Sequence, residues 1–307
     1  MTPAPPAAPG RVRRRVRLEL TPPFAVAPAL GGMAAHAVPG AERTDAGAAT
    51  HTRTIHAPRG TALVTVHLAE THVHADLDLA HPDDEAHVLL LVRFWLDLDA
   101  EPGAVAAHLG TDPALAPLVA ARPGLRVLGH VDGFEAAACT VLGQQVSLAA
   151  GRTFAGRLAA AYGVPAPEGL VAFPRPARLA AATPAELQAA VGITGARSRT
   201  LHALAVACTD GLTIGPGGDL ERARQELLAL PGVGPWTVDY LALRALGDRD
   251  AFPSGDLVLR RALGGVTAAA AVALAGAWRP WRAYAVTHLW TQSSYLSAVS
   301  APAATVP

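Results

Sequence analysis

The sequence predicts an α+β fold in which a small mixed sheet domain precedes a longer helical region. In roughly the first 100 residues apolar side chains alternate with polar ones, which is the period of a half-buried strand. From Asp132 onwards apolar side chains recur at three- and four-residue spacing, which is the period of an amphipathic helix. The chain of 307 residues, 51% of them hydrophobic, is long enough to bury the cores of two or three such units.

Three segments of the N-terminal part show the alternation expected of strands. The apolar residues between positions 12 and 20 share one parity, and segments 62–68 and 72–79 alternate in the same way. A helical pattern over 84–98 is expected to cover the sheet. His72 and His74 share one strand face, but no third ligand at suitable spacing completes a metal site, so a solvated sheet face is favoured.

The helical region carries start signals for several helices. Asp132 with Glu135, and Thr183 with Glu186, have the spacing of capping boxes. The first of these helices is expected to continue to Val146. Further helices are expected over 152–162, 201–208, 220–230 and 257–263.

Charge is distributed unevenly, although the formal net charge is zero and argues against a strongly basic nucleic-acid-binding protein. Residues 1–120 hold 9 arginines against 13 acidic residues, and residues 121–307 hold 16 against 12. The second part, at +4, is therefore the better candidate for contact with DNA. All 25 basic residues are arginines, so no lysine amine is available to form a Schiff base.

Composition also bears on location and cofactors. Cys139 and Cys208 are too few for a disulfide framework, a four-thiolate zinc site or an iron–sulfur cluster, and both are predicted to be core residues. The apolar run at 268–278 is too short to cross a bilayer, and residues 1–17 lack the apolar stretch of a secretory signal. We expect a cytoplasmic monomer with no membrane association and no required cofactor.

The most informative segment is LPGVGPWT at residues 230–237, between two predicted helices. Gly232 and Gly234 permit a tight hairpin, and Pro235 suits the first position of the following helix. Backbone amides beside a helix N-terminus form a site for a phosphate oxygen, and DNA phosphate is the expected ligand. The alternative is a turn that only joins two packed helices.

This hairpin, with the following loop that ends at Asp256, resembles the helix-hairpin-helix DNA glycosylase superfamily. More narrowly, the chain is similar to AlkA-type 3-methyladenine DNA glycosylases II over four segments: 121–163, which contains LGQQVS, 193–207, 227–263 and 278–290. The resemblance implies a TBP-like mixed α/β domain at 1–108. It also implies an all-α glycosylase core of two helical subdomains at 109–307, with the helix-hairpin-helix at about 220–246.

The resemblance implies that Asp256 is the catalytic carboxylate, whereas an Asp at a helix start is otherwise an N-cap. A carboxylate near the sugar of a flipped nucleotide stabilises the positive charge that develops on C1′ and orients water. An N3- or N7-alkylated purine is already cationic and departs neutral, so one Asp can suffice. The aromatic residues implied to line the base pocket are Trp236, Tyr240 and Trp290, with ordinary core packing as the alternative; Trp281 is expected to be core.

Other roles are also implied by the resemblance. The residues expected to contact DNA are Gly232, Gly234, Gln144 and Gln145. Gln145 takes the position of a leucine wedge, and Gly255 replaces a residue that is often acidic in the family. The backbone carbonyls expected to hold a structural monovalent cation are those of Leu228, Leu230 and Val233.

We therefore expect a monofunctional DNA glycosylase of base excision repair. It would flip purines of the 3-methyladenine and 7-methylguanine type out of double-stranded DNA containing alkylated bases and leave an abasic site. Superfamily members that also cut the strand use a Lys beside the hairpin, where this chain has Pro235, Trp236 and Thr237. Two alternatives stay open: a non-catalytic module that binds DNA damage, and a glycosylase for oxidised or deaminated bases.

Overall fold

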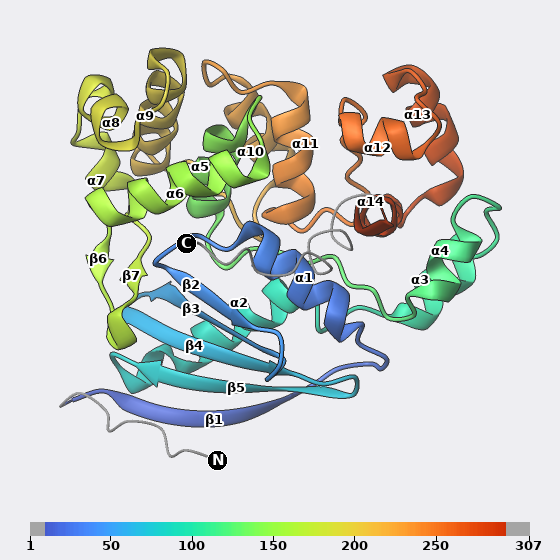
Figure 1. Ribbon diagram of the computed structural model, residues 1–307, viewed down its shortest axis with the longest axis horizontal. Helices are drawn as coiled ribbons and strands as arrows, with labels where there is room; N and C mark the ends of the chain where they lie inside the picture. The colour runs from blue at the N-terminus through green and yellow to red at the C-terminus, as the bar shows by residue number, and fades with distance from the viewer. Residues whose placement is uncertain (1–9, 293–307) are drawn as a thin grey trace, which may run out of the picture.

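An antiparallel sheet followed by a set of helices makes up the computed structural model, which describes residues 10–292 (Figure 1). The predicted α+β fold is confirmed. The expectation about a secretory signal at 1–17 lies partly outside the described residues. Within them, no helix combines the length and the apolar character needed to span a membrane.

The sheet has the strand order β1-β5-β4-β3-β2, and every neighbouring pair is antiparallel. Its strands are β1 (Val12–Glu19), β2 (Glu42–Asp45), β3 (Thr50–Ala57), β4 (Gly60–Leu68) and β5 (His72–Leu79). The helices α1 (Val26–His36) and α2 (Glu85–Leu96) pack on the buried face and lie between the sheet and the helical part (Figure 1). The predicted face of β5, which includes Val73 and Leu77, is fully buried in that core.

The sequence prediction missed α1, β2 and β3. Strand β3 does not alternate in polarity, because His51, Arg53 and their neighbours are polar and yet buried. They are buried because they find partners in other elements, a tertiary effect that strand periodicity does not register.

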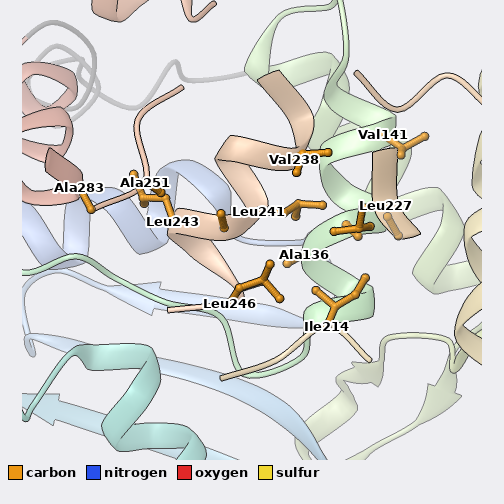
Figure 2. Close-up of a cluster of buried hydrophobic side chains, with 14 of the residues drawn as sticks. Ala136, Val141, Ile214, Leu227, Val238, Leu241, Leu243, Leu246, Ala251 and Ala283 are labelled. Atoms are coloured by element: carbon orange, nitrogen blue, oxygen red, sulfur yellow. The ribbon is translucent and has the colours of Figure 1, made fainter. Parts of the chain in front are cut away.

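The helical part contains twelve of the labelled helices within the described residues. They are α3 (Pro102–Leu109), α4 (Ala116–Ala121), α5 (Gly133–Gly143), α6 (Leu148–Tyr162), α7 (Pro176–Ala180), α8 (Pro184–Val191), α9 (Gly195–Thr209), α10 (Leu220–Leu228), α11 (Pro235–Arg244), α12 (Leu257–Ala262), α13 (Ala268–Leu274) and α14 (Arg282–Trp290). A short hairpin of β6 (Val164–Pro165) and β7 (Val171–Ala172) lies between α6 and α7. Figure 2 shows the core where α5, α10 and α11 meet, with Ala136, Leu227 and Leu241 among its buried side chains.

The predicted caps are present, but several helix boundaries differ from the prediction; α9, for example, begins at Gly195 and not at 201. Thr183 and Glu186 form the full capping box, but Asp132 caps α5 alone, because the Glu135 side chain turns inward to Arg53. Helix α5 ends at Gly143 instead of reaching Val146. Helix α6 begins earlier than expected, because Ser147 accepts a hydrogen bond from the Ala150 amide and caps it.

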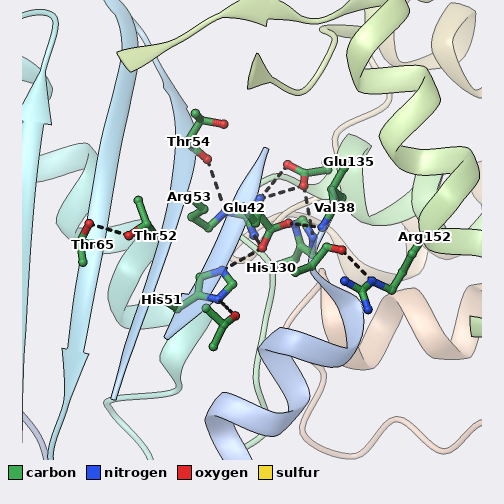
Figure 3. A network of polar contacts seen from close by, with 12 residues as sticks. Val38, Glu42, His51, Thr52, Arg53, Thr54, Thr65, His130, Glu135 and Arg152 are labelled. Atoms are coloured by element: carbon green, nitrogen blue, oxygen red, sulfur yellow. Dashed lines mark hydrogen bonds and ion pairs between the residues drawn. The ribbon is translucent and has the colours of Figure 1, made fainter. Parts of the chain in front are cut away.

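A buried ionic network joins the sheet to α5 (Figure 3). Arg53 donates to both carboxylate oxygens of Glu135 at 2.8 Å, and its guanidinium lies 3.6 Å from Glu42. His51 forms a hydrogen bond of 2.9 Å with the same Glu42. Burial opposes ionisation of Glu42, yet Arg53 and His51 together lower its pKa to about 2, whereas burial raises the pKa of Glu135 to about 8. Glu42 and Glu135 therefore share Arg53 as their cation, and His51 is a further partner of Glu42.

We expect Arg53→Met to lower the free energy of unfolding by about 3–5 kcal/mol, because it leaves two buried carboxyl groups without their cation. Urea unfolding followed by tryptophan fluorescence measures the loss. The matched control, Arg59→Met, removes an arginine whose ion pair with Asp83 is exposed. It should lower the free energy of unfolding by less than about 1 kcal/mol. Equal losses in the two variants would contradict the role given to Arg53.

Candidate active site

The glycine hairpin connects α10 to α11, and its backbone fits closely against α9. Gly232 has φ +79°, and a Cβ there would lie 2.2 Å from the Oγ1 of Thr200, so no larger residue fits without movement. Gly234 caps α11 with φ −106°, and a Cβ there would meet no heavy atom within 4 Å. The hairpin is thus packed on the side of Gly232 and open on the side of Gly234.

Gln144 and Gln145, both of which were predicted to contact DNA, have different surroundings. The Gln144 side chain donates to the carbonyl of Gly232 at 3.1 Å and to Thr237 Oγ1 at 3.2 Å. Gln144, which directly follows α5, therefore stabilises the hairpin through these two hydrogen bonds. Gln145 is exposed and has φ +55°, in the short turn between α5 and α6.

Asp256 lies at the N-terminus of α12 and accepts three hydrogen bonds. Its Oδ1 accepts from the Leu259 amide at 2.7 Å and from the Trp290 indole at 3.2 Å, and its Oδ2 accepts from the Trp236 indole at 3.0 Å. Asp256 is thus both the N-cap of α12 and a carboxylate held between two indoles. All three donors, within the described residues, are neutral, so its negative charge is not cancelled by an ion pair.

The predicted aromatic residues form one group beside Asp256. Trp236 and Tyr240 stack with ring centroids 5.4 Å apart, and Tyr240 and Trp290 lie 5.8 Å apart at 46°. These rings and Asp256 line a cavity of about 350 Å³, a size typical of small-molecule sites. Gly255 lies beside this cavity, where an added Cβ would contact Trp236 at 3.6 Å. Trp281 instead packs against the core, as predicted.

The cavity also has polar walls that the sequence interpretation missed. Its additional polar lining residues include His36 from α1, His130, Cys139 from α5, Arg152 from α6 and Arg244 from α11. Cys139 was predicted as core, and it does pack against the core, but it also faces the cavity. Arg244 could have been found, because it continues the four-residue spacing of Trp236 and Tyr240. His36 could not, because α1 was not predicted.

Both cavity histidines are held in the neutral form. Burial, followed by the charge of Arg244, lowers the pKa of His36 to about 3. Burial, followed by the charge of Arg53, holds the pKa of His130 well below its usual value. Burial likewise raises the pKa of the Cys139 thiol. Near neutral pH these three groups are therefore uncharged, and the formal charges of the lining residues belong to Asp256, Arg152 and Arg244.

Comparison with known families matches almost the whole described chain. Residues 15–132 match the AlkA N-terminal domain, and residues 138–272 match the HhH-GPD superfamily base excision DNA repair protein. The chain is 44% identical over 285 residues to the probable bifunctional transcriptional activator/DNA repair enzyme AlkA of Mycobacterium tuberculosis (strain H37Rv). That match covers 90% of this chain but 56% of the relative, so the chain spans little more than half the relative's length.

A second relative is matched over nearly its full length. The chain is 35% identical over 277 residues to DNA-3-methyladenine glycosylase 2 of Escherichia coli (strain K12), covering 89% of this chain and 95% of that protein. Among solved structures, 3-methyladenine DNA-glycosylase from Archaeoglobus fulgidus has a TM-score of 0.78 at 19% identity. That match covers 92% of this chain and 99% of the solved one, and at this identity it shows a shared fold.

We expect Gly232→Ala to lower the free energy of unfolding by about 2 kcal/mol or more, because alanine is strained at this positive φ and its Cβ meets Thr200. Chemical denaturation of the purified variants gives the value. Gly234→Ala is the matched control and should shift stability by less than about 1 kcal/mol, since its Cβ would point into open space. The packing described for the hairpin is wrong if Gly234→Ala is the more damaging of the two.

Proposed function

This chain belongs to the AlkA family of helix-hairpin-helix base excision DNA repair proteins, and we propose that it is a DNA glycosylase for alkylated purines in double-stranded DNA. The observation that carries the proposal is the position of Asp256, held by the indoles of Trp236 and Trp290 at the wall of an aromatic-lined cavity. The expected substrates carry 3-methyladenine or 7-methylguanine, and the expected product is an abasic site.

Asp256 is proposed to act on the sugar of the extruded nucleotide. As the glycosidic bond breaks, positive charge develops on C1′, and a nearby carboxylate stabilises it and orients the attacking water. The two indole donors fix the direction of the carboxylate without neutralising it. Since an N3- or N7-alkylated purine departs as a neutral base, the mechanism needs no general acid at the leaving nitrogen.

The aromatic residues are proposed to hold the base, and the hairpin is proposed to hold the DNA backbone. A cationic base gains about 0.5–2 kcal/mol from each ring face that it contacts, and Trp236, Tyr240 and Trp290 offer such faces. The amides of Gly232 and Gly234 are proposed to bind a phosphate oxygen at the start of α11. Gln145, exposed next to the cavity, is proposed to fill the gap left in the duplex, while Gln144 supports the hairpin.

Three further parts of the proposal concern the hairpin cation, assembly and location. The carbonyls of Leu228, Leu230 and Val233 are proposed to hold a monovalent cation; that of Leu230 also accepts the Val233 amide at 3.2 Å, which leaves a second lone pair. No cofactor is proposed for the chemistry. We propose a monomer, since Asp256 and the three aromatic rings are supplied by one chain. We propose a cytoplasmic location, because a repair enzyme acts where the genome lies and these relatives are bacterial proteins.

We expect Asp256→Asn to reduce release of 7-methylguanine from methylated duplex DNA by about 100-fold or more, because it removes the charge that stabilises C1′. Asparagine keeps an acceptor for the Leu259 amide and the Trp290 indole but turns its NH2 group toward the Trp236 indole, so the variant should lose about 1–3 kcal/mol of stability while it still folds and binds damaged DNA. Single-turnover release with enzyme in excess measures the rate.

The matched control is Asp219→Asn, which alters the N-cap of α10 away from the cavity and should retain the wild-type rate. Unchanged release by Asp256→Asn would remove Asp256 from the mechanism. If the wild-type chain binds abasic DNA but releases no alkylated base, the non-catalytic alternative is favoured. Duplexes with single oxidised or deaminated bases, assayed in parallel, test the other enzymatic alternative.

We further propose that the enzyme hydrolyses the glycosidic bond without cutting the strand, because the chain holds no lysine to attack C1′. The abasic strand should stay full length on a denaturing gel until hot alkali is added. Borohydride added during turnover should trap no covalent protein–DNA complex. A trapped complex, or strand cleavage without alkali, would show lyase activity and contradict this part of the proposal.

A further inference from the structure

Helix α11 presents three side chains to the cavity, and the third has no role in the proposed chemistry. Trp236, Tyr240 and Arg244 are spaced by four residues, so they lie along one face of the helix. Arg244 is about 12 Å from Trp236 along the helix axis, at about 1.5 Å per residue. Because Trp236 is hydrogen-bonded to Asp256, the carboxylate lies at the Trp236 end of this row of side chains, and Arg244 is at the other end of the row. Tyr240, between them, is influenced by both charges.

The guanidinium of Arg244 is unpaired within residues 10–292. It is partly buried, yet no hydrogen bond, ion pair or aromatic ring within that part of the chain engages it. Arg152, the other arginine of the cavity, instead donates to the Ala37 carbonyl at 3.0 Å. A guanidinium has five N–H donors and no acceptor. In a partly buried place such donors are costly unless water or a ligand accepts them.

The surroundings of Arg244 leave its charge uncompensated. Asp256 is the one carboxylate among the described residues that line the cavity, and it belongs to the other end. His36 and His130, which line the cavity with Arg244, are neutral near pH 7, so neither offers a negative charge. This end of the cavity therefore favours a group that accepts hydrogen bonds and disfavours one that donates them.

We propose that Arg244 reads the edge of the extruded base that lies farthest from the sugar, and selects purines with an oxygen on C6 over purines with an amino group there. With C1′ at Asp256, the six-membered ring of a purine extends over Tyr240 toward Arg244. Oxygen O6 of 7-methylguanine accepts from a guanidinium; this is the O6 half of the usual bidentate arginine contact to guanine, because the methyl group blocks N7. The 6-amino group of 3-methyladenine directs hydrogens at the same donors. The inference rests on the proposed function and deepens it.

Charge repulsion does not produce this preference. Both lesions carry a positive charge, so the cation of Arg244 affects them alike, and the effect cancels in the ratio of their release rates. The hydrogen bond at C6 does not cancel, because a site built to donate there leaves its donors unpaired when the wrong base is bound. The ratio of the two release rates therefore isolates the contribution proposed for Arg244.

The test uses duplex DNA treated with a methylating agent, which holds both lesions in one substrate. Release of 7-methylguanine and 3-methyladenine is followed by chromatography, and the ratio of their rates does not depend on the fraction of active enzyme. Arg244→Met, which keeps the aliphatic stem, should lower the 7-methylguanine to 3-methyladenine ratio by about tenfold or more. Arg59→Met, which removes an arginine of the sheet domain outside the cavity, should leave the ratio unchanged.

Each outcome decides the inference. An unchanged ratio in folded Arg244→Met, or equal falls in both rates, overturns it, because a merely structural role would affect both bases alike. If Arg244→Met melts below the assay temperature, Arg244→Gln is tested instead. A decrease of about threefold or more in the 7-methylguanine to 3-methyladenine ratio of release rates supports the inference, and an unchanged ratio overturns it. A wild-type chain that releases neither base would instead refute the proposed function.

Discussion

The hydrogen bonds from Trp236 and Trp290 to the carboxylate of Asp256 determine the architecture of the site. They join α11, α12 and α14 at one point, so the loop before α12 cannot move without disturbing the aromatic wall. The Leu259 amide occupies a third position on the same carboxylate. Three directional contacts fix both carboxylate oxygens, and pre-organisation of this kind lets a charge act on a reacting atom without first reorienting.

The sheet domain contributes to the same cavity through α1. Helix α1 brings His36 to the cavity, and the Arg53 network fixes the sheet against α5, which carries Cys139. The position of the cavity wall therefore depends on buried charge pairs that lie outside the cavity. A buried pair of this kind contributes little net stability compared with apolar packing, but it strongly penalises any arrangement in which one partner is left alone.

The sequence predicted the parts of the fold that rest on local signals. The apolar face of β5, the Thr183 cap and the grouping of Asp256 with three aromatic residues all followed from periodicity, helix-start patterns or family resemblance. Strand β3 and the inward turn of Glu135 did not, because their polar side chains are buried only through partners distant in sequence. The four-residue spacing of Arg244 was present in the sequence, but that it has no partner within residues 10–292 could be seen only in three dimensions.

The turn at Gln145 has a further consequence. Its peptide already adopts a left-handed conformation between two helices, and Ser147 starts α6 almost immediately afterwards. For the role proposed for Gln145, a turn already ordered between two helices has little backbone entropy left to lose on entering a duplex. In that role the entropy of ordering is lost when the protein folds and not when it meets DNA, which favours rapid sampling of successive positions along a duplex.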